Sequence, residues 1–264
     1  MKKLITYIFF LSILVALVYV TKEGINIWKN VVLLNQSQTE AVIKQERMLF
    51  PAVKILHVQQ GFTYDASASR FIDFSAIVSS ATGFSIQYNP ADDISFVITN
   101  DHFCREIMLT SSLIIENYEG VQVRNSMGQV GSKILYTDSG LDLCLIEVPG
   151  FIKPAVIADY DYEAQLFEHI FIVGGPSGDF PIIIDTYVSS YINRNSVAIG
   201  SLSSAGNNFM LISEQIFPGH SGSPVFNQEG EVIGVVFGAL QTYGGISVTH
   251  KDIFDLLFRF ENDI

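Results

Sequence analysis

Ser221 stands inside a short turn near the end of the chain that is rich in glycine and proline. The run reads Phe217-Pro218-Gly219-His220-Ser221-Gly222-Ser223-Pro224-Val225, and apolar stretches flank it. Glycines allow the backbone to bend closely around a serine, and a hydroxyl displayed in this way can act as a nucleophile. The amides of Gly219 and Ser221 could then converge on an oxyanion. The chemistry that this turn indicates is nucleophilic attack by the Ser221 hydroxyl.

A serine nucleophile needs a base within hydrogen-bond reach, and the chain contains five histidines. His102 is the best candidate, because it follows the apolar run 96–99 and is expected at the end of a buried strand. A purely structural role is the alternative for a lone histidine at such a place. His220 is a poor candidate because neighbours in a tight turn point apart. His169 and His250 stand at unremarkable positions, at the start of a strand and of a helix.

The base in turn needs an acceptor that fixes its tautomer, and Asp142 is the best candidate. Asp142 stands in the otherwise apolar run 141–148, where a carboxylate without a partner would be costly. An imidazole would supply that partner. Asp138, in the preceding polar turn, is interpreted as a solvated loop residue. The candidates therefore follow the order His102, Asp142, Ser221 along the chain.

Short β-strands are the elements that must position these residues. Beyond Pro51 the sequence consists of short β-rich runs separated by Gly, Asn, Asp and Pro, which is typical of an all-β barrel or sandwich. One helix is expected at the end of the chain, over residues 252–260 and capped by Thr249. We expect strands at 52–58, 84–87, 96–99, 107–115, 120–124, 134–136, 141–148, 170–174, 182–191, 209–213 and 231–238.

The order His, Asp, Ser along the chain resembles that of the chymotrypsin-like peptidases. The other common families with a Ser-His-Asp triad have a different order. The stretch 170–178 is similar to the glycine-proline hairpin of bacterial HtrA-type proteases, and 222–227 with 231–234 resembles the glutamyl endopeptidases. The resemblance covers about residues 50–260. Further motifs similar to those of HtrA-type proteases are Pro51-Ala52-Val53-Lys54-Ile55, Ala81-Thr82-Gly83-Phe84-Ser85-Ile86, Val97-Ile98-Thr99-Asn100-Asp101-His102 and Asp142-Leu143-Cys144-Leu145.

This resemblance implies an all-β fold, a double six-stranded β-barrel of the chymotrypsin/trypsin-like type with a C-terminal helix. It implies a serine endopeptidase with a triad of His102, Asp142 and Ser221 and an oxyanion hole at Gly219 and Ser221. The substrate would be a protein or a peptide, and neither a metal ion nor another cofactor is expected. The alternative is a catalytically inactive binding module that keeps the protease fold and is tethered to a membrane.

Three departures from the family pattern refine this expectation. His220 stands where activated zymogen proteases carry an aspartate that pairs with a newly cut N-terminus, which implies a site that forms without N-terminal processing. Val236 replaces the substrate-binding histidine of glutamyl endopeptidases, which disfavours cleavage after glutamate. HtrA-type proteases usually continue into a peptide-binding PDZ domain, whereas this sequence stops at Ile264, so regulation through such a domain is not expected unless a partner supplies it.

The resemblance places the substrate pocket at two stretches of the sequence. Gln215 and Ile216 precede the nucleophile, where the specificity pocket of the family begins. Phe237, Gly238 and Ala239 would form the opposite wall. Because these residues are apolar or uncharged, we expect a medium-sized apolar residue at the cleavage site.

The N-terminal region differs from the rest of the chain in composition. After two lysines, seventeen uncharged residues at 4–20 would span roughly 25 Å as a helix, near the lower limit for crossing a bilayer. The run is long for a cleaved signal peptide and lacks a small-x-small cleavage site. We therefore expect residues 1–21 to form a hydrophobic signal-anchor helix, with a signal peptide as the alternative. A partly helical juxtamembrane stalk is expected at 22–49 and a protease domain at 50–264.

Charge and cysteine content constrain location and partners. Lys2 and Lys3 favour a cytoplasmic N-terminus, which would place the protease domain on the extracytoplasmic side, or outside the cell if residues 1–21 are cleaved. A net charge of -12 argues against nucleic-acid binding, because like charges repel phosphate backbones. Cys104 and Cys144 are expected to be small buried core residues, with a single bridge between them as the alternative.

Overall fold

The chain divides into two compact units, Met1–Gln45 and Glu46–Ile264. The predicted anchor at 1–21 and most of the predicted stalk at 22–49 lie outside the residues that the structure describes, and residues 39–49 form a helix. Within the described residues, no helix is both long enough and apolar enough to cross a membrane. The computed structural model describes residues 29, 39–65, 67, 70–105, 111–194, 207–240 and 244–263.

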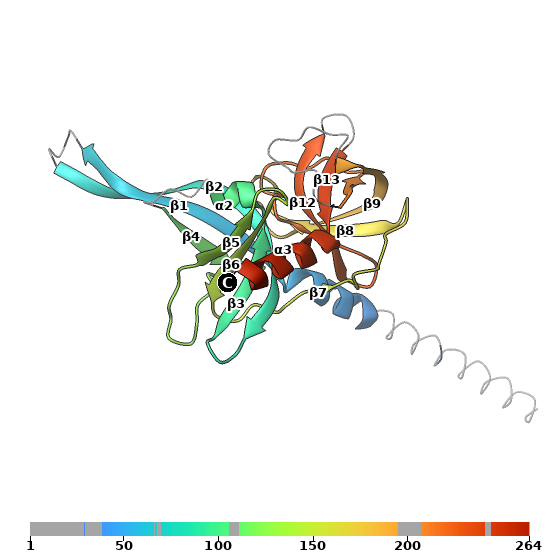
Figure 1. Cartoon of the computed structure of the whole chain (residues 1–264). Helices are drawn as coiled ribbons and strands as arrows, with labels where there is room; N and C mark the ends of the chain where they lie inside the picture. The colour runs from blue at the N-terminus through green and yellow to red at the C-terminus, as the bar shows by residue number, and fades with distance from the viewer. Residues whose placement is uncertain are drawn as a thin grey trace, which may run out of the picture. The chain divides into compact units, whose positions relative to one another are not determined.

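Six antiparallel strands form the first sheet, in the spatial order β4-β1-β2-β3-β6-β5 (Figure 1). Successive side chains of these strands point to opposite faces of the sheet, and one face buries residues such as Val53, Val97 and Ile146. Removing this apolar surface from water stabilises the sheet. The strands are β1 (Ala52–Asp65), β2 (Arg70–Asn89), β3 (Ile94–Thr99), β4 (Ser111–Glu116), β5 (Lys133–Asp138) and β6 (Leu143–Pro149).

The second sheet has the order β11-β8-β9-β10-β13-β12-β7, and a pairing of β11 with β12 closes six of its strands into a barrel. The two-residue strand β7 runs parallel to β12 and adds to the outside of this closed set. The prediction of a six-stranded barrel is therefore confirmed for this half of the fold. The strands are β7 (Val156–Ile157), β8 (His169–Gly174), β9 (Ile182–Ile192), β10 (Phe209–Ile212), β11 (Pro224–Phe226), β12 (Glu231–Leu240) and β13 (Gly244–Thr249).

Helix α3 (His250–Asp263) follows β13 and begins two residues before the predicted start. The main-chain N–H of Thr249 donates to Asp252 Oδ2 at 3.1 Å, a reciprocal bond typical of helix N-termini. Ile253 and Leu256 are buried, and Phe260 lies with its ring 5.9 Å from Tyr136 of β5. The predicted apolar face is thus confirmed, and it packs against the protein core.

Apolar side chains from both sheets and from α3 meet in one core cluster. Leu141 and Leu143 contribute to it from the first sheet, and Phe209 and Val235 contribute from the second barrel. Because a shared core leaves little freedom for one sheet to move against the other, it can hold functional groups from both sheets at fixed distances.

Several predicted elements differ from the structure. The predicted strand at 120–124 contains only an isolated bridge between Glu116 and Gln122. Strand β2 begins at Arg70 instead of 84, and β1 and β2 run together past the other strands of the first sheet as a long hairpin (Figure 1). Most side chains of β2 between 70 and 78 are exposed, so no buried face marked the strand in the sequence. Strands β7 and β13 and the short helix α2 (Asp101–Arg105) were also not predicted.

Candidate active site

His102 lies on α2, one turn of helix that starts two residues after β3 ends. Phe103 and Cys104 are buried and anchor this turn, while the side chain of His102 is 38% exposed. Its main-chain N–H donates to Asp142 Oδ1 at 2.9 Å. The neighbouring Asn100 donates from Nδ2 to the main-chain oxygen of Asp142 at 3.0 Å. Main-chain and side-chain bonds therefore join the segments that carry these two residues.

Asp142 lies in the turn between β5 and β6, with a left-handed φ of +55°. The fully buried Leu141 and Leu143 flank it and fix the turn in the core. Its carboxylate is buried and meets the imidazole of His102, with Nδ1 2.8 Å from Oδ2 and 3.1 Å from Oδ1. Since a carboxylate only accepts, Nδ1 of His102 carries the proton in this contact and Nε2 is left as an acceptor.

Ser221 follows a β-turn made by Phe217, Pro218, Gly219 and His220. The N–H of His220 donates to Phe217 O at 3.1 Å, and Gly219 has a φ of +99°. Proline at the second position and glycine with positive φ at the third are the features of a type II turn. The turn presents Ser221 Oγ at 3.2 Å from His102 Nε2. The three candidates from the sequence thus form one hydrogen-bonded chain.

The peptide bond between Pro218 and Gly219 is held in a defined orientation. Pro218 O accepts from Ser177 N at 2.8 Å. Because the C=O and N–H of a trans peptide point in opposite directions, the Gly219 amide points away from Ser177. The next carbonyl, Gly219 O, accepts from Thr82 Oγ1 at 2.8 Å. A Cβ at position 219 would lie 2.1 Å from Gly175 O, so only glycine fits here.

His220 is buried and faces the main chain of the same turn. Its Nδ1 lies 3.1 Å from Phe217 O and 3.3 Å from Phe217 N. Burial lowers the pKa of this imidazole below its ordinary value of 6.5, which favours the neutral form. Gly174 leaves room for the ring, since a Cβ there would lie 2.9 Å from His220 Cδ2. These contacts agree with the expectation that His220 is not the base.

The predicted pocket residues lie on two segments beside the turn 217–221 that carries Ser221, called here the nucleophile turn. Gly222 N donates to Val236 O, and Val236 N donates to Ser223 O, which ties the turn to β12. Phe237 is buried, whereas Gln215 and Ala239 are exposed. Ile216 packs against β13, where a Cβ on Gly245 would lie 2.4 Å from Ile216 Cγ1. Gly245 was missed in the sequence because the strand that carries it was not predicted.

The remaining histidines have partners outside this group. His169 is exposed and lies 3.3 Å from Asp185 on the neighbouring strand. His250 is buried, with Nε2 3.0 Å from Asp159 O. His57 is buried, and its ring meets the ring of Phe103 edge-on at 6.4 Å. Where the structure is described, no group of three or more His, Cys, Asp and Glu could hold a metal ion.

A disulfide joins Cys104 to Cys144, with an S–S distance of 2.03 Å. The cysteines are buried as expected, but the bridge was only the alternative prediction. Each cysteine lies two residues after a triad candidate, His102 or Asp142. This shared spacing is a signal in the sequence that could have indicated the pairing, but the prediction did not use it. The bridge therefore links helix α2, which carries His102, to strand β6, which begins directly after Asp142.

The prediction that Asp138 is a solvated loop residue is wrong. Its side chain is only 10% exposed and forms an ion pair with Arg259 of α3. Its Oδ1 accepts from the main-chain N–H groups of Gly140 and Leu141 at 2.9 and 3.0 Å. The contact with Arg259 joins residues 121 positions apart, so local sequence gave no sign of it.

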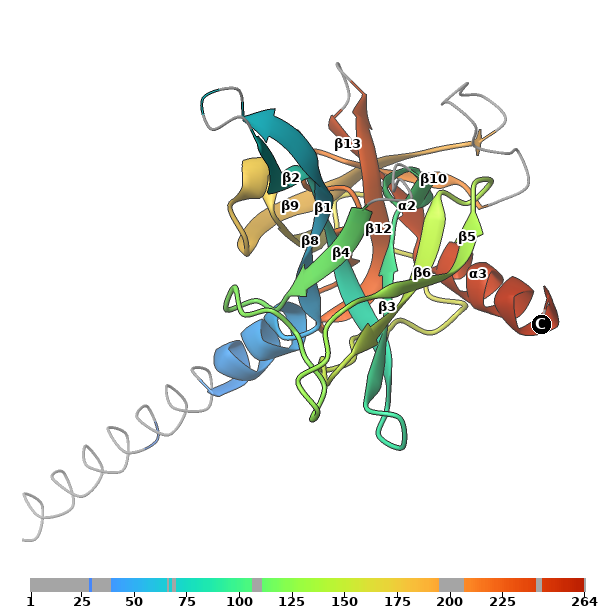
Figure 2. The same ribbon diagram turned by 90° about the vertical axis from the view of Figure 1, so that its left-hand side faces the viewer.

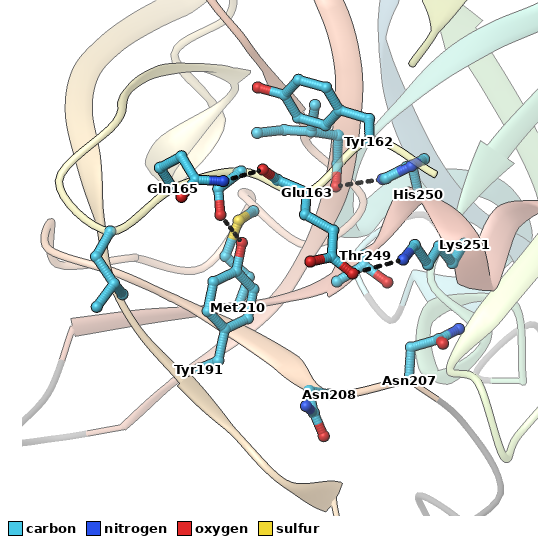
Figure 3. A pocket seen from close by; sticks show the side chains of 13 residues that line it. Tyr162, Glu163, Gln165, Tyr191, Asn207, Asn208, Met210, Thr249, His250 and Lys251 are labelled. Atoms are coloured by element: carbon cyan, nitrogen blue, oxygen red, sulfur yellow. Dashed lines mark hydrogen bonds and ion pairs between the residues drawn. The ribbon is translucent and has the colours of Figure 1, made fainter. Parts of the chain in front are cut away.

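A cavity of about 490 Å³ lies in the second barrel, lined in part by Tyr162, Tyr191 and His250 (Figure 3). Several of its polar side chains bond across it or to nearby backbone. Lys251 Nζ lies 3.3 Å from Glu163 Oε1, and Tyr191 Oη donates to Ala164 O at 2.8 Å. None of the predicted site residues lines this cavity, so it is separate from the chain of His102, Asp142 and Ser221.

Curated proteins with related sequences are serine proteases. Serine protease Do-like HtrA of Bacillus subtilis (strain 168) is 25% identical over 191 residues, a match that covers 71% of this chain and 40% of that protein. A probable periplasmic serine endoprotease DegP-like of Ectopseudomonas mendocina (strain ymp) is 28% identical over 149 residues, covering 53% of this chain and 28% of that protein. The chain thus spans less than half the length of these two relatives.

Solved structures share the fold. Rv3671c of M. tuberculosis H37Rv, in an inactive form, superposes with a TM-score of 0.59 at 18% identity, covering 83% of this chain and 90% of that chain. The serine endoprotease of Yersinia pestis also has a TM-score of 0.59, at 14% identity, covering 83% of this chain and 66% of that chain. Residues 81–235 match the family described as a trypsin-like peptidase domain. The predicted resemblance is confirmed: the chain belongs to the family of trypsin-like peptidase domains.

Proposed function

We propose that this chain is a serine endopeptidase that hydrolyses peptide bonds in proteins or peptides. The observation that carries the proposal is the hydrogen-bonded chain from Asp142 through His102 to Ser221, with contacts of 2.8 and 3.2 Å. The three residues come from separate elements: helix α2, the turn that precedes β6 of the first sheet, and the turn that precedes β11 of the second sheet. An imidazole placed between a buried carboxylate and a serine hydroxyl is oriented to act as a general base.

In the proposed reaction, Ser221 Oγ attacks the carbonyl carbon of the scissile peptide, and its proton passes to His102 Nε2. The C–N bond then breaks as His102 returns that proton to the leaving amine, which leaves an acyl group on Ser221. A water molecule releases the acyl group by the same steps in turn. Asp142 stabilises the imidazolium that forms twice in the cycle and keeps its ring in place.

We assign the oxyanion hole to the amides of Gly219 and Ser221. The bond from Ser177 N to Pro218 O supports this assignment, because it fixes the direction of the Gly219 amide. A donor aimed at the developing oxyanion contributes about 3 to 4 kcal/mol to stabilisation of the transition state. His220 holds the same turn without a newly cut N-terminus, which supports a site that is formed without processing.

Substrate side chains are proposed to bind between Gln215 and Ile216 on one side and Phe237, Gly238 and Ala239 on the other. None of these residues is charged, which favours an uncharged residue at the cleavage site. Ile216 occupies the space above Gly245 and so narrows this region. A medium-sized apolar residue fits these walls, whereas glutamate has no positively charged partner among the residues that form them.

We further propose that residues 4–20 tether the protein to a membrane, with the protease domain on the extracytoplasmic side. The uncharged run at 4–20 after two lysines supports the tether. The Cys104–Cys144 disulfide supports the location, because disulfides persist mainly in oxidising compartments. Cell fractionation with an alkaline carbonate wash tests the tether: the intact chain should stay in the membrane pellet, and release into the wash would contradict it.

Replacing Ser221 by alanine tests the proposed activity. The S221A variant should fold but should no longer cleave an unstructured protein substrate. Ser223 offers a matched control, because it lies two residues away and its hydroxyl is buried. The S223A variant should keep most of the activity. Equal cleavage by S221A and the unmodified protein would contradict the assignment, and substrate binding without any cleavage by the unmodified protein would support the inactive binding module.

A further inference from the structure

The turn that carries Asp142 is held from outside the first sheet. Asp142 has a left-handed φ of +55°, a conformation that residues other than glycine adopt when their surroundings support it. The turn consists of residues 138–142, between the end of β5 and the start of β6. Its outside contacts come from Arg194, which follows β9, and from helix α3. Figures 1 and 2 show α3 beside strands β5 and β6 in both views.

Arg194 makes the first of these contacts. Its side chain is 2% exposed, and Nη1 donates to Gly140 O at 3.1 Å, two residues before Asp142. Nη2 donates to Asp252 Oδ2 at 2.8 Å, and Nε donates to Asn207 O. The guanidinium carbon lies 4.5 Å from the centre of the Phe209 ring. The planar guanidinium is therefore fixed on three edges and one face, with one edge on the Asp142 turn.

Asp252 holds Arg194 from the first turn of α3. It is fully buried, and besides Arg194 it accepts from Thr249 N at 3.1 Å and from Asn207 N at 3.3 Å. Burial raises the pKa of this carboxyl, and the Arg194 guanidinium acts in the opposite direction. The ion pair of Arg194 and Asp252 is thus a buried, hydrogen-bonded pair, whose orientation is more fixed than that of an exposed pair.

Arg259 makes the second contact, two helical turns after Asp252 on the same side of α3. Its Nη1 forms an ion pair with Asp138 Oδ2 at the start of the turn. The other oxygen of Asp138 accepts from Gly140 N and Leu141 N. Helix α3 therefore holds the turn at two points, at Asp138 through Arg259 and at Gly140 through Arg194.

We propose that Arg194 is a positioning residue for catalysis: with Asp252 and Arg259 it forms a brace that keeps the Asp142 carboxylate on His102 Nδ1. The inference rests on the proposed function, because it concerns the base that activates Ser221. Loss of the brace lets the turn shift, and a shifted carboxylate stabilises the imidazolium of His102 less well. The brace therefore acts on the rate of reaction and on the pKa of His102, and substrate binding is left largely unchanged.

The R194K variant tests the brace, because lysine keeps the charge beside Asp252 but cannot bond Gly140, Asp252 and Asn207 together. With a fluorogenic peptide substrate, we expect kcat to fall about tenfold and KM to change less than twofold. The apparent pKa in the pH profile of kcat/KM should move lower, because the imidazolium loses stabilisation. A lower melting temperature with unchanged kcat and pH profile would show a merely structural role and would overturn the proposal.

A second variant keeps the test valid if R194K does not fold. Arg259 is 37% exposed, so R259M removes the other contact with the turn at smaller risk to the fold, and we expect kcat to fall about threefold with the same direction of pKa change. The K251M variant is the matched control on α3, since Lys251 pairs with Glu163 away from the turn, and it should keep kcat and the pH profile. Unchanged kcat in R259M would overturn the brace.

Failure of the brace can be told from failure of the proposed function. If the unmodified protein cleaves the peptide and S221A does not, the triad stands whatever the result with Arg194 and Arg259. If the unmodified protein and S221A behave alike, the proposed function fails before the brace is reached. The same peptide and the same pH series serve all of these variants.

Discussion

The two halves of the candidate site are held by different kinds of contact. The acid-base half consists of His102 and Asp142, and the nucleophile half is the turn 217–221 that carries Ser221. His102 and Asp142 are fixed mainly by side-chain links, namely the Cys104–Cys144 disulfide and the ion pairs that reach the Asp142 turn. Ser221 is fixed mainly by main-chain hydrogen bonds, such as those from Thr82 N to Ser221 O and from Gly222 N to Val236 O, both 2.8 Å long. Side-chain links can be removed one at a time, whereas the nucleophile turn depends on backbone shape and on space that only glycine leaves.

Replacing Asp142 by asparagine should give the largest loss of activity, because it disables the acid-base half. An amide in place of the carboxylate favours the wrong tautomer of His102, and kcat should fall about 10⁴-fold while the fold is kept. The measurement is peptide cleavage, with circular dichroism as the check on folding. The exposed pair of His169 and Asp185 offers a control, so D185N should change kcat less than twofold. A tenfold or smaller effect of D142N would show that Asp142 does not orient the base.

Replacing Gly219 by alanine should disable the nucleophile half and lower the activity. The new Cβ would lie 2.1 Å from Gly175 O, so the turn must shift and the Gly219 amide moves with it. Loss of one oxyanion donor lowers kcat by about 10² to 10³. Gly120 also has a positive φ, of +73°, but a Cβ there meets nothing within 4 Å. The G120A variant should therefore keep kcat, and a G219A variant of full activity would refute this role of the turn.

Removing the disulfide should destabilise the protein by about 4 kcal/mol, the chain-entropy estimate for a closed loop of 40 residues. The measurement is the free energy of unfolding of the C104A/C144A variant in urea. The chain has two cysteines, so a reductant should lower the stability of the unmodified protein and leave the variant unchanged. Equal free energies of unfolding of the two proteins under oxidising conditions would show that the bridge does not stabilise the protein.

A smaller effect, on the pH dependence of stability, is expected from His220, whose side chain lies in the nucleophile half. Burial lowers its pKa in the folded protein, so below pH 6.5 the unfolded chain takes up a proton that the folded protein does not. Stability should therefore fall as the pH drops below 6.5. Between pH 7.5 and 5.5 the free energy of unfolding of the unmodified protein should fall more than that of the H220Q variant, as measured by unfolding in urea at each pH. Parallel pH curves would contradict this account.

The sequence allowed prediction of the residues that are proposed to react better than of the contacts that hold them. His102 and Asp142 could be found because each adjoins an apolar run, and Ser221 because glycine and proline mark its turn. The brace could not be found, since Arg194 and Gly140 lie 54 residues apart and no local pattern relates them. Long-range side-chain contacts of this kind arise only once the core has brought the sheets together.

The predicted strands show the same limit in another form. Strands with one buried face, such as β3 and β8, were predicted to within two residues because apolar residues mark them. The outer part of β2 has polar and apolar residues on both exposed faces, and β13 carries two glycines, so neither gave a clear period. Because β13 gave no clear period, the strand beside the predicted pocket residue Ile216 was missed, and its residue Gly245 was missed with it.

The central claim is that Ser221 is a nucleophile activated by His102. Reaction with a fluorophosphonate, followed by mass spectrometry of the digested protein, tests it most directly, because the reagent forms a stable bond with an activated serine. We expect one adduct, on the peptide that contains Ser221; it should be lost in S221A, and its formation should be strongly slowed when His102 is replaced by alanine. Absence of any adduct on the folded, unmodified protein, or an adduct on a different serine, would contradict the account.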